Sequence, residues 1–158
     1  MQWFKGAAWG LLFASVVATA TQSAIPIVFQ LEREGVRLEV VPGTGFEESP
    51  VLYFMLFDSR TARMACFELD VADDIPVLIT SLADYLRQPK PSIIFFWGLF
   101  GYRPWDDFQV VGLGDAILIR MVEYVGNEDL YAFIAIRLDH TEVKQLISAL
   151  QEFRPPHW

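Results

Sequence analysis

The chain has 158 residues, of which 53% are hydrophobic and 15% aromatic, and its formal net charge is -8. This length and hydrophobic content fit one folded domain and exclude a largely disordered chain. Because the Lys and Arg residues are few and scattered, the charge argues against nucleic acid as a partner and favours a protein partner of basic character.

Residues 1–24 have the pattern of a secretory signal peptide. Lys5 is the only charged residue before Glu32, and an apolar run from Gly6 to Ala18 leads into the small-x-small sequence Ala18-Thr19-Ala20. The run is too short and too rich in Ala, Ser and Thr to predict a membrane span. We therefore expect export to the periplasm or the medium, with no membrane span after processing. The alternative is a cytoplasmic protein whose N-terminal segment forms a core helix.

The next part of the chain predicts strands followed by a helix. Segments 25–31 and 36–41 are expected to form a hairpin around Gly35, and two more strands are predicted over 51–57 and 64–71. Asp73 or Asp74 would cap a helix that ends before Pro89 and Pro91. Its predicted apolar face consists of Ile75, Leu78, Ile79, Leu82 and Tyr85.

A similar unit is predicted near the C-terminus. Strands over 116–125 and 130–138 flank a turn at 126–129, and Asp139 with Glu142 has the spacing of a capping box. The apolar face of the second helix falls at a constant shift of 68 positions from the first, at Val143, Leu146, Ile147, Leu150 and Phe153.

These matches predict a duplicated strand-strand-helix unit with half-repeats at about 51–88 and 115–154. We expect one α+β domain over residues 25–158. Because hairpins pair antiparallel strands, it would contain a mostly antiparallel curved sheet with both helices on one face.

Two segments carry a family resemblance, ACFELDVADDIPVLITSLADYL and YAFIAIRLDHTEVKQLISALQEFRPP. Their pattern of hairpin, helix, apolar middle, hairpin and terminal helix resembles small bacterial immunity-type proteins, such as the wall-associated-protein immunity family. The resemblance covers about 51–156. It implies an inhibitor that binds a toxin and performs no chemistry.

No complete catalytic or metal-binding constellation is present in the sequence. The two histidines, His140 and His157, are assigned to the start of a helix and to the C-terminal tail. Cys66 lies on a strand beside Glu68 and Asp70, which would raise the pKa of its thiol and weaken it as a nucleophile. A single cysteine also excludes an intramolecular disulfide. We expect no enzymatic activity, no cofactor and no metal.

The segment from Ser92 to Asp107 is unusually aromatic. Ile93 to Phe96 is interpreted as part of a buried strand, whereas Gly98 and Gly101 predict a loop after it. Aromatic and arginine side chains on a loop are typical of interface hot spots. The predicted partner-binding residues are Tyr102, Arg103, Trp105, Asp106 and Asp107.

The sequence therefore favours a non-enzymatic binding or immunity-like protein of the bacterial cell envelope, which binds a protein partner through this loop. A carrier of a small apolar ligand is the alternative, with the aromatic residues lining its pocket. An enzyme is the third choice, and the oligomeric state stays open.

Overall fold

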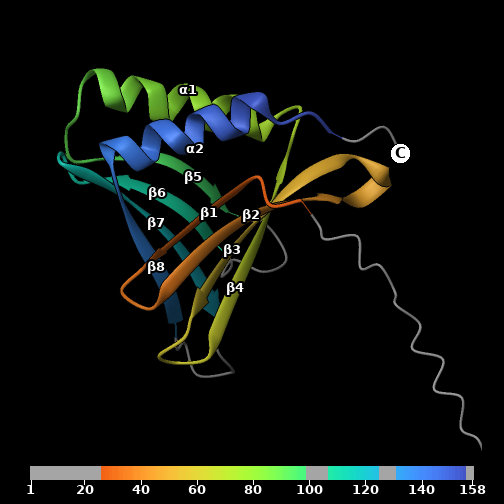
Figure 1. The fold of residues 1–158 in the computed structure, drawn as a ribbon, viewed down its shortest axis with the longest axis horizontal. Coiled ribbons are helices and arrows are strands. Elements are labelled where there is room, and N and C mark those ends of the chain that lie inside the picture. Colours follow the sequence, from red (N-terminus) through yellow and green to blue (C-terminus); the bar gives the residue numbers. More distant parts are fainter. Residues whose placement is uncertain (1–25, 99–106, 125–130, 156–158) are drawn as a thin grey trace, which may run out of the picture.

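A computed structural model of the chain describes residues 26–98, 107–124 and 131–155 (Figure 1). Within these residues the chain forms two antiparallel sheets of four strands each, and each sheet is followed by one α-helix. The first sheet, called sheet A, consists of β1 (Phe29–Arg33), β2 (Val36–Thr44), β3 (Pro50–Asp58) and β4 (Arg63–Asp70), with the short 3-10 turn η1 (Phe46–Glu48) between β2 and β3. Helix α1 (Asp74–Arg87) follows it.

The second sheet, called sheet B, consists of β5 (Ser92–Gly98), β6 (Asp107–Gly112), β7 (Ala116–Tyr124) and β8 (Tyr131–Asp139). Helix α2 (His140–Glu152) follows it. In both sheets the strands are ordered in space as they are in the sequence, so each strand pairs only with its neighbours along the chain.

The predicted α+β class with antiparallel pairing and two helices is confirmed. The strands divide between two sheets, where the sequence had suggested one curved sheet. The half-repeats at about 51–88 and 115–154 fall on β3-β4-α1 and β7-β8-α2, and each is preceded by two further strands. The duplication itself stays a prediction.

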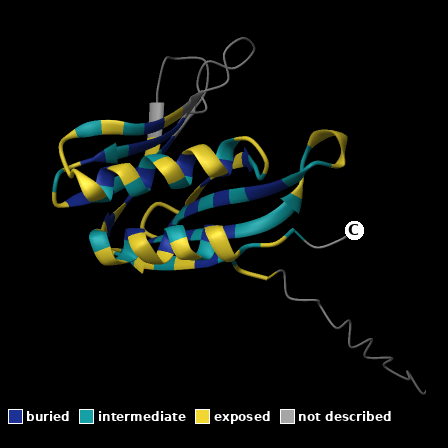
Figure 2. Cartoon of the chain, turned by 90° about the horizontal axis from the view of Figure 1, so that it is seen from above, coloured by how far each residue is buried: buried dark blue, intermediate teal, exposed yellow. Residues whose placement is uncertain are grey.

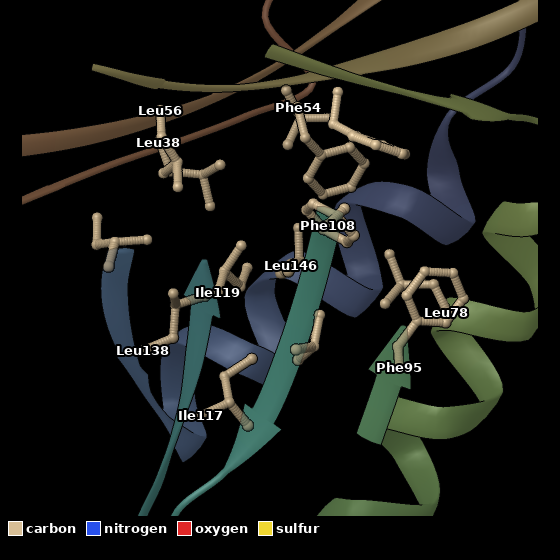
Figure 3. Packing of buried hydrophobic residues seen from close by; sticks show 14 of the residues in the cluster. Leu38, Phe54, Leu56, Leu78, Phe95, Phe108, Ile117, Ile119, Leu138 and Leu146 are labelled. Carbon is tan, nitrogen blue, oxygen red and sulfur yellow. The ribbon is translucent and has the colours of Figure 1, made fainter. Parts of the chain in front are cut away.

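The core lies between the inward faces of the two sheets. Phe108 on β6 is fully buried at its centre, with ring centroids 5.1 Å from Phe54, 5.6 Å from Phe67 and 6.0 Å from Phe95. Figure 3 shows Phe54 of sheet A facing Phe108 of sheet B. Alternate residues along the strands point inward and complete the core. These residues include Leu38, Leu56, Leu69, Ile117, Ile119, Ile136 and Leu138.

The two helices lie side by side along one end of the sheets (Figure 1), and Figure 2 looks onto them. Their buried residues lie on the predicted apolar faces and are Ile75, Leu78, Leu82 and Tyr85 in α1 and Val143, Leu146 and Leu150 in α2. The Tyr85 hydroxyl donates to the Ala116 carbonyl at 2.7 Å and accepts from the Gly114 amide at 2.8 Å. This side chain ties α1 to the turn between β6 and β7.

The two helix starts differ from each other. Asp139 caps α2 as predicted, because its carboxylate accepts from the Thr141 and Glu142 amides while Glu142 accepts from the Asp139 amide. The predicted side-chain cap of α1 is wrong. Asp73 makes no capping hydrogen bond, and Asp74 instead accepts from the amide of Asp70 on β4.

The predicted signal peptide, residues 1–24, lies outside the described residues. In the part of the chain that the structure describes, no helix has both the length and the apolar character needed to cross a membrane.

Candidate nucleic-acid interface

The outward face of sheet B carries exposed aromatic residues. On β8, Ile134, Ile136 and Leu138 point into the core, whereas Phe133 lies on the opposite parity and has 66% of its surface exposed. A large apolar ring on the solvent face of a strand contributes nothing to the core. Such a residue marks a candidate binding surface.

Strand β5 places a second aromatic side chain on the same face. A register irregularity between Ile93 and Phe95 lets Phe95 point inward against Phe108, while Ile93 and Phe96 are 68% and 45% exposed. The sequence-based interpretation of Ile93 to Phe96 as buried is therefore wrong at Ile93 and Phe96. The extra residue of a bulge changes which side of the sheet the following side chains face. A run of apolar residues can then resemble a strand that is buried on both faces.

One cross-strand row runs over the middle of this face. Phe96 pairs with Gln109, Gln109 with Arg120 and Arg120 with Ala135, so the row crosses all four strands. The Arg120 Nε donates to the Gln109 Oε1 at 2.6 Å, and Gln109 has only 9% of its surface exposed. The buried amide therefore holds the guanidinium of Arg120 on the surface between the aromatic side chains.

A second row lies beside it and consists of Ile93, Val111, Leu118 and Arg137. Arg137 forms an ion pair with Asp115 in the turn before β7. We call this surface the aromatic face, defined by Ile93, Phe96, Gln109, Val111, Leu118, Arg120, Phe133, Ala135 and Arg137. Its named residues include two arginines. Asp107 falls in the next cross-strand row, because it pairs with Val122 and Val122 pairs with Phe133. Asp139, at the end of β8, caps α2.

The outward face of sheet A carries more carboxylates than arginines. It carries Glu32, Glu39 and Glu68 against Arg37, together with exposed Met64 and Cys66. Arg37 contacts two neighbours on its own sheet. Its Nε lies 3.1 Å from a Glu39 carboxylate oxygen, and its guanidinium lies 5.6 Å from the Phe57 ring centroid. The net acidity of the chain is therefore unevenly distributed between the two sheets.

The predicted partner-binding residues are only partly placed by the structure. Tyr102, Arg103, Trp105 and Asp106 lie outside the described residues, and Asp107 is the first residue of β6. Their assignment as a site stays a prediction.

The titratable residues considered for catalysis lie apart. Cys66 is exposed on β4, and burial of its thiol, with a smaller effect of Glu68, raises the pKa of that thiol. His140 is half-buried at the start of α2, where its Nε2 atom is buried and its ring centroid lies 5.9 Å from that of Tyr85, edge-on. Among the described residues no group of three His, Cys, Asp or Glu side chains could hold a metal ion.

On the described surface, two hollows lie on or beside α1, and the smaller one, of about 270 Å³, is lined by Pro76, Val77, Thr80 and Ser81. The carrier alternative needs an apolar cavity walled by Phe95, but Phe95 packs into the core against Phe108. The larger hollow, of about 330 Å³, lies at the end of α1 and the start of β5, and its lining is mostly polar: Ser81, Asp84, Tyr85, Gln88, Lys90, Ser92 and Ile94.

Sequence reasoning did not select Phe96, Gln109, Arg120 or Phe133. The alternation along β8 could have identified Phe133. Ile134, Ile136 and Leu138 already form an inward-facing set, so Phe133, Ala135 and Arg137 must face outward. Gln109 and Arg120 carried no such signal, because their contact depends on the pairing of β6 with β7.

The fold has counterparts among solved structures of plant proteins. It is similar to the plant transcriptional regulator PBF-2, with 14% identity, a TM-score of 0.57 and coverage of 80% of this chain and 79% of that one. It is similar to WHY1 from Arabidopsis thaliana, with 17% identity, a TM-score of 0.56 and coverage of 78% and 80%. WHY3 from the same plant gives 15% identity, a TM-score of 0.53 and coverage of 78% and 83%. No family model matches the chain, and no curated protein matches it in sequence.

These similarities correct several expectations from the sequence. PBF-2, whose fold is similar to that of this chain, is described as a transcriptional regulator. The expected envelope role through a protein partner, with its small-ligand alternative, is therefore wrong, as are the exclusion of nucleic acid and the expectation of export. The physical error was to use whole-chain charge, because the net charge of -8 does not reveal that Arg120 and Arg137 lie together on the outward face of sheet B.

Proposed function

We propose that the chain binds single-stranded nucleic acid on the aromatic face of sheet B and carries out no chemistry on it. The observation that carries the proposal is the placement of two exposed rings, Phe96 and Phe133, around Arg120 on one open strand surface. A role in controlling transcription fits the fold shared with PBF-2.

Stacking is the interaction that this surface can supply. Every base has a flat π-face, so exposed aromatic rings bind unpaired bases with little dependence on sequence. In a duplex these base faces are stacked on one another and are not accessible to a side chain. The exposed rings therefore favour a single strand over a duplex.

The charge of the chain sets the expected salt dependence. Arg120 and Arg137 are the cations of the aromatic face, and Arg137 is already paired with Asp115. Few phosphates would be neutralised, so affinity should fall only weakly as salt rises. Stacking, rather than attraction to phosphate, would then supply most of the binding energy.

The test is to measure the affinity of the chain for a fluorescent single-stranded oligonucleotide by anisotropy, before and after truncation of the rings. Phe96→Ala and Phe133→Ala should each weaken binding by about 1–3 kcal/mol, the range for losing one base–aromatic stack. Met64→Ala is a matched control, because Met64 is an exposed apolar side chain, 59% exposed, on the acidic face of sheet A.

Both phenylalanine variants should fold normally, because truncation of an exposed side chain changes stability by only about 0.5 kcal/mol. Circular dichroism and thermal unfolding would verify this. Wild-type affinity in a folded Phe96→Ala/Phe133→Ala double variant would contradict the proposed site. Absence of binding to single strands by the wild type would contradict the function itself.

A further inference from the structure

We propose that Arg120, held in place by Gln109, gives the aromatic face a preference for guanine over the other bases. This inference rests on the proposed function and adds base selectivity to a site whose stacking rings alone would be tolerant of sequence.

The position of Arg120 relative to Phe133 supports this role. Arg120 pairs with Ala135, two residues beyond Phe133 on β8, so Arg120 and Phe133 are diagonal neighbours on the same face. Diagonal neighbours lie about 7–8 Å apart, within reach of long and aromatic side chains. A base stacked on the Phe133 ring would then have its edge close to the Arg120 guanidinium. The small side chain of Ala135 leaves room between them.

The hydrogen bond to Gln109 orients the guanidinium. It uses the Nε of Arg120, at 2.6 Å from the Gln109 Oε1, and leaves the two Nη groups outside this contact. Gln109 is anchored because it is almost fully buried. Gln109 is a neutral amide, so this contact does not neutralise the charge of Arg120, unlike the contacts of Arg33 and Arg137 with carboxylates.

Guanine is the base whose edge matches this geometry. It presents two adjacent acceptors, O6 and N7, which suit the paired donors of a guanidinium. Adenine offers N7 beside an amino donor, which would face the arginine donors unfavourably. Lysine would be a poorer substitute for Arg120 here, because an ammonium lacks the planar pair of donors.

The experiment compares oligothymidylates of about twelve nucleotides, within the usual range for one sheet-based binding site. The strands carry one central guanine, adenine or 7-deazaguanine, or no substitution, and a single guanine avoids guanine-rich secondary structure. The guanine strand should bind about tenfold more tightly than the adenine strand, as expected for one bidentate contact. The 7-deazaguanine strand, which lacks N7, should lose most of this gain.

Three variants separate base reading from other roles of the arginine. Arg120→Lys keeps the charge but removes the planar pair of donors, so the guanine strand should lose several-fold more affinity than plain oligothymidylate does. Gln109→Leu should reduce the preference by releasing the guanidinium, which identifies Gln109 as a positioning residue. Arg37→Lys on sheet A is the control and should leave the preference intact.

The outcomes distinguish the inference from the function on which it rests. Binding of all strands with equal affinity would overturn the guanine preference and leave the proposed function standing. An equal loss on every strand in Arg120→Lys would show that Arg120 does not distinguish guanine from the other bases and would also overturn the preference. Failure of the wild type to bind any of the four strands would overturn the proposed function.

Discussion

Cys66 is the single thiol of the chain and lies on the outward side of β4, opposite Met55. The sequence suggested that carboxylates would raise the pKa of this thiol. The structure adds a larger cause, because burial of the thiol raises its pKa first and the charge of Glu68 adds to it. The thiol is therefore exposed enough to be reached and yet poorly ionised.

This environment predicts slow alkylation of Cys66. Since the thiolate is the reactive form and a raised pKa reduces its population, iodoacetamide should react more slowly than with free cysteine at mildly alkaline pH. The rate should reach its half-maximum at a higher pH than for free cysteine. Glu68→Gln should shift that midpoint downward, while Glu39→Gln, two strands away, should not. A midpoint equal to that of free cysteine would contradict the prediction.

At the scale of single elements, the start of α2 depends on the charge of Asp139. Hydrogen bonding from the Glu142 amide lowers the pKa of the Asp139 carboxyl, and the Thr141 amide and the charge of Arg33 act in the same direction. A carboxyl with a lowered folded-state pKa stabilises the fold above its unfolded-state pKa. That contribution is lost as pH falls through the folded-state value.

The prediction is a steeper loss of stability in acid for the wild type than for Asp139→Asn. Asparagine still offers a capping oxygen but does not titrate, so it removes only the pH dependence. Urea unfolding midpoints measured between about pH 6 and pH 2 would give the comparison, because acidic groups titrate in that range. Parallel curves for the two proteins would show that this carboxylate does not couple to folding.

Helices and strands could be predicted wherever apolar residues recur at the regular spacing of one type of element. The β1–β2 hairpin, β4, both helix faces and the cap of α2 follow from such periods. The structure has them near the predicted bounds, except that β1 begins at Phe29 and was predicted from residue 25. Strand β5 was misread because a bulge places apolar residues on both of its faces. The division into two sheets and the contact between Gln109 and Arg120 depend on pairing between strands, which local periods do not encode.

At the scale of the whole molecule, Phe108 holds the two sheets together. Its ring contacts Phe54 and Phe67 from sheet A and Phe95 from sheet B, and it is fully buried. Phe108→Ala should therefore lower the free energy of unfolding by about 3–5 kcal/mol, the range for emptying a buried aromatic site. Phe133→Ala, on the outward face of the same sheet, should cost only about 0.5 kcal/mol.

Urea denaturation followed by tryptophan fluorescence and by circular dichroism would measure both variants. The two signals should change together if the sheets unfold as one cooperative unit. A Phe108→Ala protein as stable as Phe133→Ala would show that the core between the sheets contributes little to stability.

The pairing of each strand only with its sequence neighbours also bears on the order of folding. Contacts between residues close in sequence close small loops, so this topology has a low contact order for a β-rich chain and favours rapid folding. During synthesis, sheet A and α1 can emerge from the ribosome and pair before any strand of sheet B exists. Until β6 arrives with Phe108, the inner side of sheet A, with Leu38, Phe54 and Leu56, has no partner sheet to cover it. The nascent chain therefore passes through a stage in which a paired half exposes a broad apolar surface to the chaperones around it.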